Sequence, residues 1–247
     1  MPVILHTEGL CRHFGGVLAT NEVSIQIVEC KLKSIIGPNG AGKTTLVNVI
    51  TGRLPASSGK VLYKDREITN RPPHELIHLG ICRTFQITSI FSGLSVFENI
   101  RISRQMRIGG SFKIFSSRKG LKQVNEEAWK ILERIGLDDR ASSPAKNLAH
   151  GDKCLLEVGM ALAGDPKILF LDEPTAGMSP AETDHIARLI KSLSEQIAVV
   201  LIEHDMDVIM SISDEITVLH QGRIIAEGPP ATIQGNDLVK EAYLGHG

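Results

Sequence analysis

The chain has 247 residues, 42% of them hydrophobic, and its 27 Lys and Arg against 28 Asp and Glu give a formal net charge of −1. This length can bury a full core, and the near-neutral charge excludes a general basic field that would attract nucleic acid or anionic lipid. Apolar runs such as 168–171 and 197–202 are too short for a bilayer crossing of about 20 residues. The N-terminus lacks the pattern of a secretory signal, so we expect a cytoplasmic chain.

The first part of the chain is predicted to form an antiparallel layer. Val23, Ile25 and Ile27 alternate with polar residues, which is typical of a strand with one solvated face, and residues 61–63 fit the same pattern. Other stretches are mostly apolar, as expected for strands of a parallel sheet that is covered on both faces. They are residues 32–36, 168–171 and 197–202.

A glycine-rich segment follows the first of these apolar stretches and precedes a helical pattern. In such a strand-to-helix turn, successive N–H groups point into one concavity and the helix N-terminus adds positive potential, which suits a polyphosphate. Lys43 is placed to bind the β and γ phosphates, and the Thr44 hydroxyl is placed to bind Mg²⁺. The expected nucleotide-binding residues of this segment are Gly37, Pro38, Asn39, Gly40, Ala41, Gly42, Lys43, Thr44 and Thr45.

Gln86 closes the run 81–86, which is predicted to be a strand with a polar end. A neutral amide there can bind Mg²⁺ or the attacking water, and its movement can pass into the segment that follows. That segment is predicted to be mainly helical, with a stripe at Ala128, Ile131, Leu132 and Ile135 that repeats at i, i+3, i+4 and i+7.

The basic stretch 101–122 is expected to be solvated, since neither an aromatic ladder nor helix-turn-helix spacing accompanies it. A role facing a membrane partner stays open for it. Near the end of the chain, Gln221-Gly222 separates two apolar runs and predicts a β-hairpin.

Polar residues follow two of the apolar stretches. Asp172 and Glu173 come directly after 168–171, where Asp172 is suited to hold Mg²⁺ and Glu173 to deprotonate the water that attacks the γ-phosphate. His204 follows 197–202 and is expected at the same sheet edge, where it can hydrogen-bond the γ-phosphate. The alternatives are an acidic turn without a ligand and a histidine that is satisfied within the fold.

The order of these motifs resembles the ATP-binding subunit of ABC transporters. It consists of the glycine-rich loop, Gln86, a glycine-containing helix start at 148–152, Asp172-Glu173 and His204. More narrowly, three segments resemble the importers of branched-chain amino acids. They are residues 173–182, 202–210 and 242–245.

The resemblance implies an α/β fold with a P-loop NTPase (RecA-like) parallel-sheet core, an N-terminal antiparallel β layer and an inserted helical subdomain. We expect a single ABC ATPase domain over residues 1–247. Residues 1–86 and 164–247 would form the nucleotide-binding core with the antiparallel layer, and residues 87–163 the helical signature subdomain.

The resemblance also assigns roles to residues whose pattern alone gives none. Phe14 falls where the family stacks an aromatic ring on adenine. The signature segment, which in this family closes over the ATP bound to the partner subunit, corresponds to Leu148, Ala149, His150, Gly151 and Asp152. The usual sequence is Leu-Ser-Gly-Gly-Gln. Ala149 therefore lacks a hydroxyl, His150 replaces a glycine, and Asp152 puts a carboxylate near phosphate oxygens.

The leading hypothesis is an ATP-hydrolysing motor subunit of an ABC importer, for branched-chain or other hydrophobic amino acids. ATP and Mg²⁺ are the implied cofactors, with Glu173, His204 and Gln86 as catalytic residues and Thr44, Gln86 and Asp172 as metal-binding residues. The expected partners are a second ATP-binding subunit, identical or related, two membrane permease subunits and, indirectly, an extracytoplasmic solute-binding protein. No nucleic acid is expected, and the chain would lie on the inner face of the cell membrane.

Other functions stay open at this point. One is a soluble ATPase acting on nucleic acid or ribosomes, which the near-neutral charge disfavours, and another is an importer ATPase for urea or short amides. A module that clamps ATP without turnover is a further alternative, because Ala149 and Asp152 depart from the family pattern. Finally, four apolar residues either line a groove for a helix of the membrane partner or pack in the core. They are Ile87, Ile90, Phe91 and Leu94.

Overall fold

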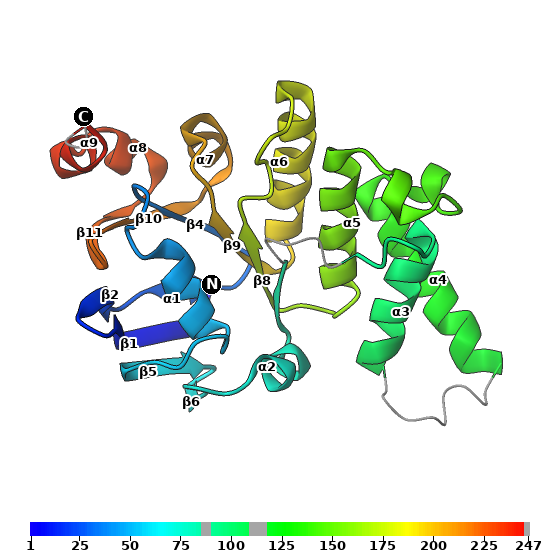
Figure 1. The fold of residues 1–247 in the computed structure, drawn as a ribbon, viewed down its shortest axis with the longest axis horizontal. Helices are drawn as coiled ribbons and strands as arrows, with labels where there is room; N and C mark the ends of the chain where they lie inside the picture. Colours follow the sequence, from blue (N-terminus) through cyan, green and yellow to red (C-terminus); the bar gives the residue numbers. More distant parts are fainter. Residues whose placement is uncertain (85–89, 109–117, 245–247) are drawn as a thin grey trace.

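The computed structural model describes residues 1–84, 90–108 and 118–244 of the chain. In this part of the chain the strands form two sheets, and helices cover them (Figure 1). None of the helices described is both long enough and apolar enough to cross a membrane.

The first sheet is the predicted antiparallel layer, with strand order β2-β1-β5-β6 and β3 also paired to β1. Val23, Ile25 and Ile27 are all buried, but they do not share one strand: Val23 ends β2, Ile27 lies in β3, and Ile25 lies between the two strands. The reason is Thr7, whose Oγ1 donates to the Val23 carbonyl (2.9 Å) and accepts from the Ile25 N–H (3.0 Å). The strands of this antiparallel sheet are β1 (Val3–Phe14), β2 (Val17–Val23), β3 (Gln26–Val28), β5 (Ser58–Tyr63) and β6 (Arg66–Glu67).

The second sheet has the strand order β11-β10-β4-β9-β8-β7, in which β11 alone pairs antiparallel. Every residue of β4, β8 and β9 is buried, so the three predicted core strands are confirmed. The predicted hairpin is confirmed too, with positive φ at Gln221 (48°) and Gly222 (77°) in its turn. The strands are β4 (Leu32–Ile36), β7 (Ile81–Arg83), β8 (Ile168–Asp172), β9 (Ala198–Ile202), β10 (Glu215–His220) and β11 (Arg223–Gly228).

Helices pack around the sheets. Helix α1 lies between them, since Leu46, Val47 and Ile50 share one hydrophobic cluster with residues of both sheets. Figure 1 shows α3, α4 and α5 grouped at one side of the parallel sheet, with α8 and α9 at the opposite end. The helices are α1 (Lys43–Ile50), α2 (Pro73–Leu79), α3 (Val96–Ile108), α4 (Arg118–Ile135), α5 (His150–Leu162), α6 (Pro180–Ser194), α7 (Met206–Ile212), α8 (Pro230–Gln234) and α9 (Asp237–Leu244).

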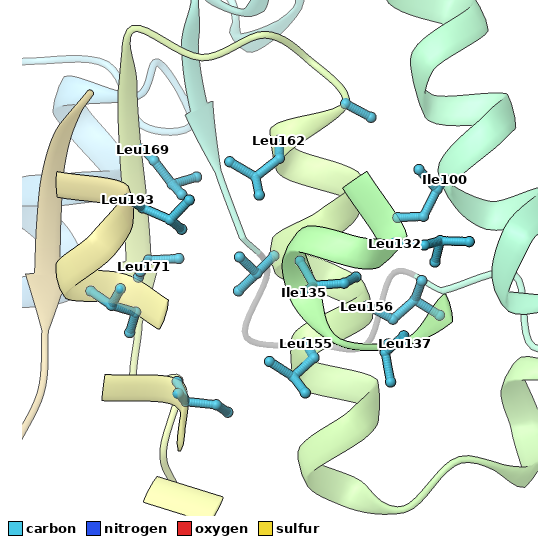
Figure 2. Packing of buried hydrophobic residues seen from close by; sticks show 14 of the residues in the cluster. Ile100, Leu132, Ile135, Leu137, Leu155, Leu156, Leu162, Leu169, Leu171 and Leu193 are labelled. Atoms are coloured by element: carbon cyan, nitrogen blue, oxygen red, sulfur yellow. The ribbon is translucent and has the colours of Figure 1, made fainter. Parts of the chain in front are cut away.

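A second hydrophobic cluster joins α3, α4 and α5 to the sheet (Figure 2). The predicted stripe of α4 lies in it, with Leu132 and Ile135 buried on the side of α5. At Gly159 of α5, an added Cβ would lie 2.6 Å from Ile135 Cδ1 and 2.8 Å from Ile100 Cδ1. This glycine therefore permits the close approach of α5 to the other two helices.

The carboxyl ends of β4, β9, β8 and β7 meet at one edge of the parallel sheet, because these strands are neighbours and run in the same direction. Strand β7 ends at Arg83 instead of running on to the predicted end at Gln86. Gln86 and Ile87 lie outside the described residues. The edge carries the glycine-rich loop and the polar residues that follow β8 and β9.

Candidate active site

The glycine-rich loop connects β4 to α1, and two of its glycines leave no room for a side chain. An added Cβ would lie 2.1 Å from the Leu219 carbonyl oxygen at Gly37 and 2.3 Å from the Ala19 carbonyl oxygen at Gly42. Gly40 faces open space, but its φ of 78° lies in the left-handed region. The loop thus packs tightly between β2 and the end of β10, and its shape depends on glycine at positions 37, 40 and 42.

Helix α1 begins directly after the loop, at Lys43. Its N-cap is Gly42, which has no side chain to cap the helix, and its first turn carries no acidic residue. The N–H groups at Lys43, Thr44 and Thr45 therefore face the hollow of the loop without an internal helical acceptor. This is the arrangement that binds anions at helix N-termini.

The Lys43 ammonium is folded over its own loop. Nζ donates to the carbonyl oxygens of Gly37 (2.6 Å) and Pro38 (3.1 Å), which leaves one of its three N–H bonds for a ligand. Burial lowers the pKa of Lys43, while the charges of Glu173 and Asp172 raise it. The structure therefore brings both carboxylates within electrostatic reach of this ammonium.

Asp172 ends β8, and its side chain is 1% exposed. Its Oδ2 accepts a hydrogen bond from Arg83 Nη2 (2.5 Å), whereas its buried Oδ1 has no partner among the residues described. No group of three or more His, Cys, Asp or Glu in that part of the chain could hold a metal by itself. The unpartnered Oδ1 fits Mg²⁺, which proteins commonly bind through one carboxylate together with phosphates and water.

Glu173 follows Asp172 in a strained conformation. Its φ is 48°, which is uncommon for a residue with a Cβ, and its N–H donates to the Ile202 carbonyl (2.8 Å). Such strain clusters at functional sites because the surrounding structure must hold it. The next residue, Pro174, accepts a hydrogen bond from the Cys154 thiol (3.0 Å), and burial raises the pKa of that thiol to about 12. Cys154 therefore supports the turn as a neutral donor.

His204 follows β9, and its side chain is 65% exposed at the same sheet edge. Its Nδ1 lies 3.5 Å from Oε2 of Glu203, which is buried. Glu203 accepts hydrogen bonds from the N–H groups of Thr175 (3.1 Å) and His204 (2.9 Å), and also from the Thr175 hydroxyl. Glu203 therefore joins the end of β9 to the turn that carries Glu173.

Phe14 is half exposed at the end of β1. The Arg12 guanidinium lies 4.7 Å from the centroid of its ring and donates to the Pro55 carbonyl (3.0 Å). The same β1–β2 hairpin reaches the glycine-rich loop through Ala19. Phe14 is thus an accessible aromatic ring on the hairpin that touches the loop.

The segment 148–152 forms the start of α5. The helix begins at His150, within the predicted helix start 148–152, with Ala149 in an extended conformation as its N-cap. His150 Nε2 lies 3.0 Å from the Ala176 carbonyl oxygen. At Gly151, an added Cβ would lie 2.9 Å from Glu182 Oε1, so this glycine permits the close approach of α5 to the Glu182 side chain of α6.

The Asp152 carboxylate forms an ion pair with the Arg140 guanidinium. The negative charge that distinguishes this segment from Leu-Ser-Gly-Gly-Gln is therefore balanced within the chain. Leu148, the first residue of the segment, is buried in the hydrophobic cluster of α3, α4 and α5.

Comparisons with known proteins decide the family. A model described as "ABC transporter" matches residues 20–176, and one described as "Branched-chain amino acid ATP-binding cassette transporter" matches residues 223–247. The chain belongs to the ABC transporter family. As an ABC ATPase, it carries the glycine-rich loop, Asp172 and Glu173 at the same edge of the parallel sheet.

The similarity to individual ABC proteins covers nearly the whole chain. The chain is 39% identical over 249 residues to the high-affinity branched-chain amino acid transport ATP-binding protein LivG of Escherichia coli K12, covering 98% of each. Its identity to BraF of Pseudomonas aeruginosa is also 39%, with the same coverage. Among solved structures, the ADP conformation of an ATP-binding cassette of an ABC transporter aligns with a TM-score of 0.88 at 35% identity, covering 100% of both chains. The predicted family and fold class are confirmed.

Three residues of this ABC ATPase contribute contacts that the sequence analysis did not assign. Arg83 pairs with Asp172, Glu203 with Thr175, and Arg140 with Asp152. Arg83 is a charged residue at the end of a short strand whose other residues are buried. Of these three residues, Arg83 is therefore the one whose sequence pattern could have indicated its role.

Ala149→Ser is expected to stabilise the protein by about 1 kcal/mol, because a serine hydroxyl at the N-cap can accept a hydrogen bond from an N–H of the first turn of α5. The measurement is the free energy of unfolding from urea denaturation. Ala161→Ser, inside the same helix, is the control and should give no gain. An unfolding free energy for Ala149→Ser at or below the wild-type value would contradict the assigned cap.

Proposed function

We propose that this chain is the ATP-hydrolysing motor subunit of an importer for branched-chain or other hydrophobic amino acids. The observation that carries the proposal is the meeting of three features at one sheet edge: the glycine-rich loop, the buried Asp172 and the strained Glu173. Similarity to amino-acid transport ATP-binding proteins over 98% of the chain supports the choice of substrate class.

In this proposal the ATP phosphates occupy the hollow of the loop. The N–H groups at the start of α1 and the Lys43 ammonium hold them, and Phe14 stacks on the adenine through the part of its ring that is exposed. Thr44, Asp172 and Gln86 hold Mg²⁺, which neutralises charge on the phosphates when it is bound.

Hydrolysis depends on residues beyond the loop. Glu173 accepts the proton of the attacking water, and its fixed backbone aims the carboxylate. His204 is exposed and donates a hydrogen bond to the γ-phosphate, while Glu203 holds the turn and the histidine in register. Gln86 would sense the same phosphate and pass its presence into the helical subdomain that follows Gln86 in the sequence.

A second ATP-binding subunit completes the site in this proposal. The segment Leu148–Asp152 faces the nucleotide of that subunit, and Arg140 keeps the Asp152 charge from repelling the phosphates. A related subunit is favoured over an identical one, because the signature segment of this chain departs from the usual pattern.

The membrane partner is assigned to an apolar cavity of about 420 Å³ between α2, β7, α3 and α5. Exposed apolar side chains line it at Ile77, Phe91 and Met106, and Leu94 is also exposed but does not line it. Such a groove suits a helix of a permease subunit. Residues 87–163 would act as the helical subdomain that passes motion to two permeases, with the chain on the inner face of the membrane.

The proposal is tested by purifying the tagged chain from detergent-solubilised membranes. We expect two permease subunits and a related ATP-binding subunit to copurify, and Phe91→Asp to lose the permeases while it keeps ATP binding. Uptake of labelled leucine should depend on the chain, whereas urea uptake should not. Recovery with ribosomes or nucleic acid and without membrane proteins would contradict the proposal.

A further inference from the structure

We propose that Arg83 is a positioning residue that fixes the Asp172 carboxylate for Mg²⁺ and ties it to the first helix after the phosphate loop. The inference rests on the proposed function, because it concerns how this chain binds nucleotide with its metal. Arg83 itself would touch neither the nucleotide nor the metal.

The Arg83 guanidinium connects three elements of the sheet edge. Nη2 donates to Asp172 Oδ2 (2.5 Å) at the end of β8, and Nη1 donates to Asn48 Oδ1 (2.6 Å) in α1. Nη1 also lies 3.5 Å from Thr51 Oγ1 at the end of α1. Because Arg83 ends β7, one planar group fixes the distance between the helix that carries Lys43 and the strand that carries Asp172.

The ion pair uses one oxygen of the carboxylate and leaves the other free. The side chains of Arg83 and Asp172 are 7% and 1% exposed, so water has little access to either. Asp172 Oδ1 and Arg83 Nε are both buried and have no hydrogen-bond partner within the described ranges. An arginine with only a structural role would be stabilised most by a bidentate interaction, in which two N–H groups donate to both oxygens of the carboxylate. The observed geometry instead holds the carboxylate at Oδ2 and leaves Oδ1 without a partner of its own, available to another ligand.

A fixed orientation of the Asp172 carboxylate matters for binding Mg²⁺. The ion demands near-octahedral geometry and loses its water reluctantly, so a carboxylate that rotates is a poorer ligand than one that is held. Partners behind a metal ligand commonly change metal affinity by about 10–100-fold when they are removed. Other charges near the pair include Arg53, Lys43 and Glu173, and Arg53 is too exposed to replace a buried guanidinium.

The test measures the Mg²⁺ dependence of nucleotide binding, without any turnover. A fluorescent ATP analogue is bound to the isolated chain in EDTA and then titrated with Mg²⁺. We expect Arg83→Gln to raise the Mg²⁺ concentration at half-maximal change at least about tenfold, with metal-free binding of the analogue close to wild type. Arg83→Lys, which keeps the charge but cannot reach both partners, should give a smaller rise.

The matched control is Arg104→Gln, which removes another partly buried arginine whose Nε donates to Glu127 Oε2 (2.6 Å), in α3 and away from the sheet edge. It should lower thermal stability without moving the Mg²⁺ midpoint. An Arg83→Gln midpoint that is unchanged or lowered, with only a thermal shift like that of Arg104→Gln, would overturn the inference.

If Arg83→Gln does not fold, Asn48→Ala decides the matter together with Arg83→Lys. Asn48→Ala keeps the ion pair and removes its anchor on α1, so its midpoint should rise above that of the wild type. Unchanged midpoints in both variants would overturn the inference. A wild-type chain that fails to bind the analogue at all would refute the proposed function instead, so the two failures are distinguishable.

Discussion

Glu173→Gln is expected to retain ATP binding and to slow hydrolysis by about 10²–10⁴-fold, the usual effect of losing a general base. Glutamine has nearly the same shape as glutamate, so it can occupy the strained turn after β8, but it cannot take a proton from water. The measurement is phosphate release by the assembled transporter, beside binding of a fluorescent ATP analogue.

The control for this variant is Glu195→Gln, which removes an exposed carboxylate at the end of α6. Its turnover should match the wild type. Turnover in Glu173→Gln that equals the wild type would remove Glu173 from the mechanism.

Lys43→Ala is expected to weaken ATP binding by roughly 10- to 150-fold, which corresponds to the 1.5–3 kcal/mol of a hydrogen bond to a charged group. The variant also removes the donor to the Gly37 and Pro38 carbonyls, so the loop loses the contact that closes it over its own hollow. Isothermal titration calorimetry with ATP measures the loss.

Lys60→Ala provides the comparison, since Lys60 is an exposed lysine on the antiparallel sheet, 4.0 Å from Glu67. ATP affinity should be unchanged in that variant. Normal affinity in Lys43→Ala would contradict the assignment of the loop as the phosphate site.

Much of the sheet edge follows from local sequence. A run of apolar residues that ends in glycines, or in Asp172 and Glu173, predicts where a buried strand stops and what it presents there. The strict spacing from Gly37 to Lys43 carries the loop, because backbone shape and helix start are both local properties. The hairpin at Gln221-Gly222 was predictable for the same reason.

Long-range contacts were not predictable from the sequence. Arg83 and Asp172 are 89 positions apart and meet because β7 and β8 are neighbours. Gly37 and Gly42 lack space because Leu219 and Ala19 arrive from other strands. These contacts depend on strand order, which residue types and spacing alone do not specify.

Other differences arose from single side chains. Thr7 splits the alternating segment 23–27 into two strands by binding both sides of the break. Arg140 balances Asp152, although the sequence shows an acidic substitution without its partner. In each case the deciding group is polar and lies on another element, where a hydrophobic pattern gives no signal.

The proposed function requires that a nucleoside triphosphate binds the loop around Lys43 with its terminal phosphate beside Glu173. A crystal structure with a non-hydrolysable ATP analogue and Mg²⁺ tests it most directly. We expect the terminal phosphate between Lys43 Nζ and the Glu173 carboxylate, with Mg²⁺ on the Asp172 side. An analogue bound elsewhere on the chain, or phosphates that point away from Glu173, would contradict it.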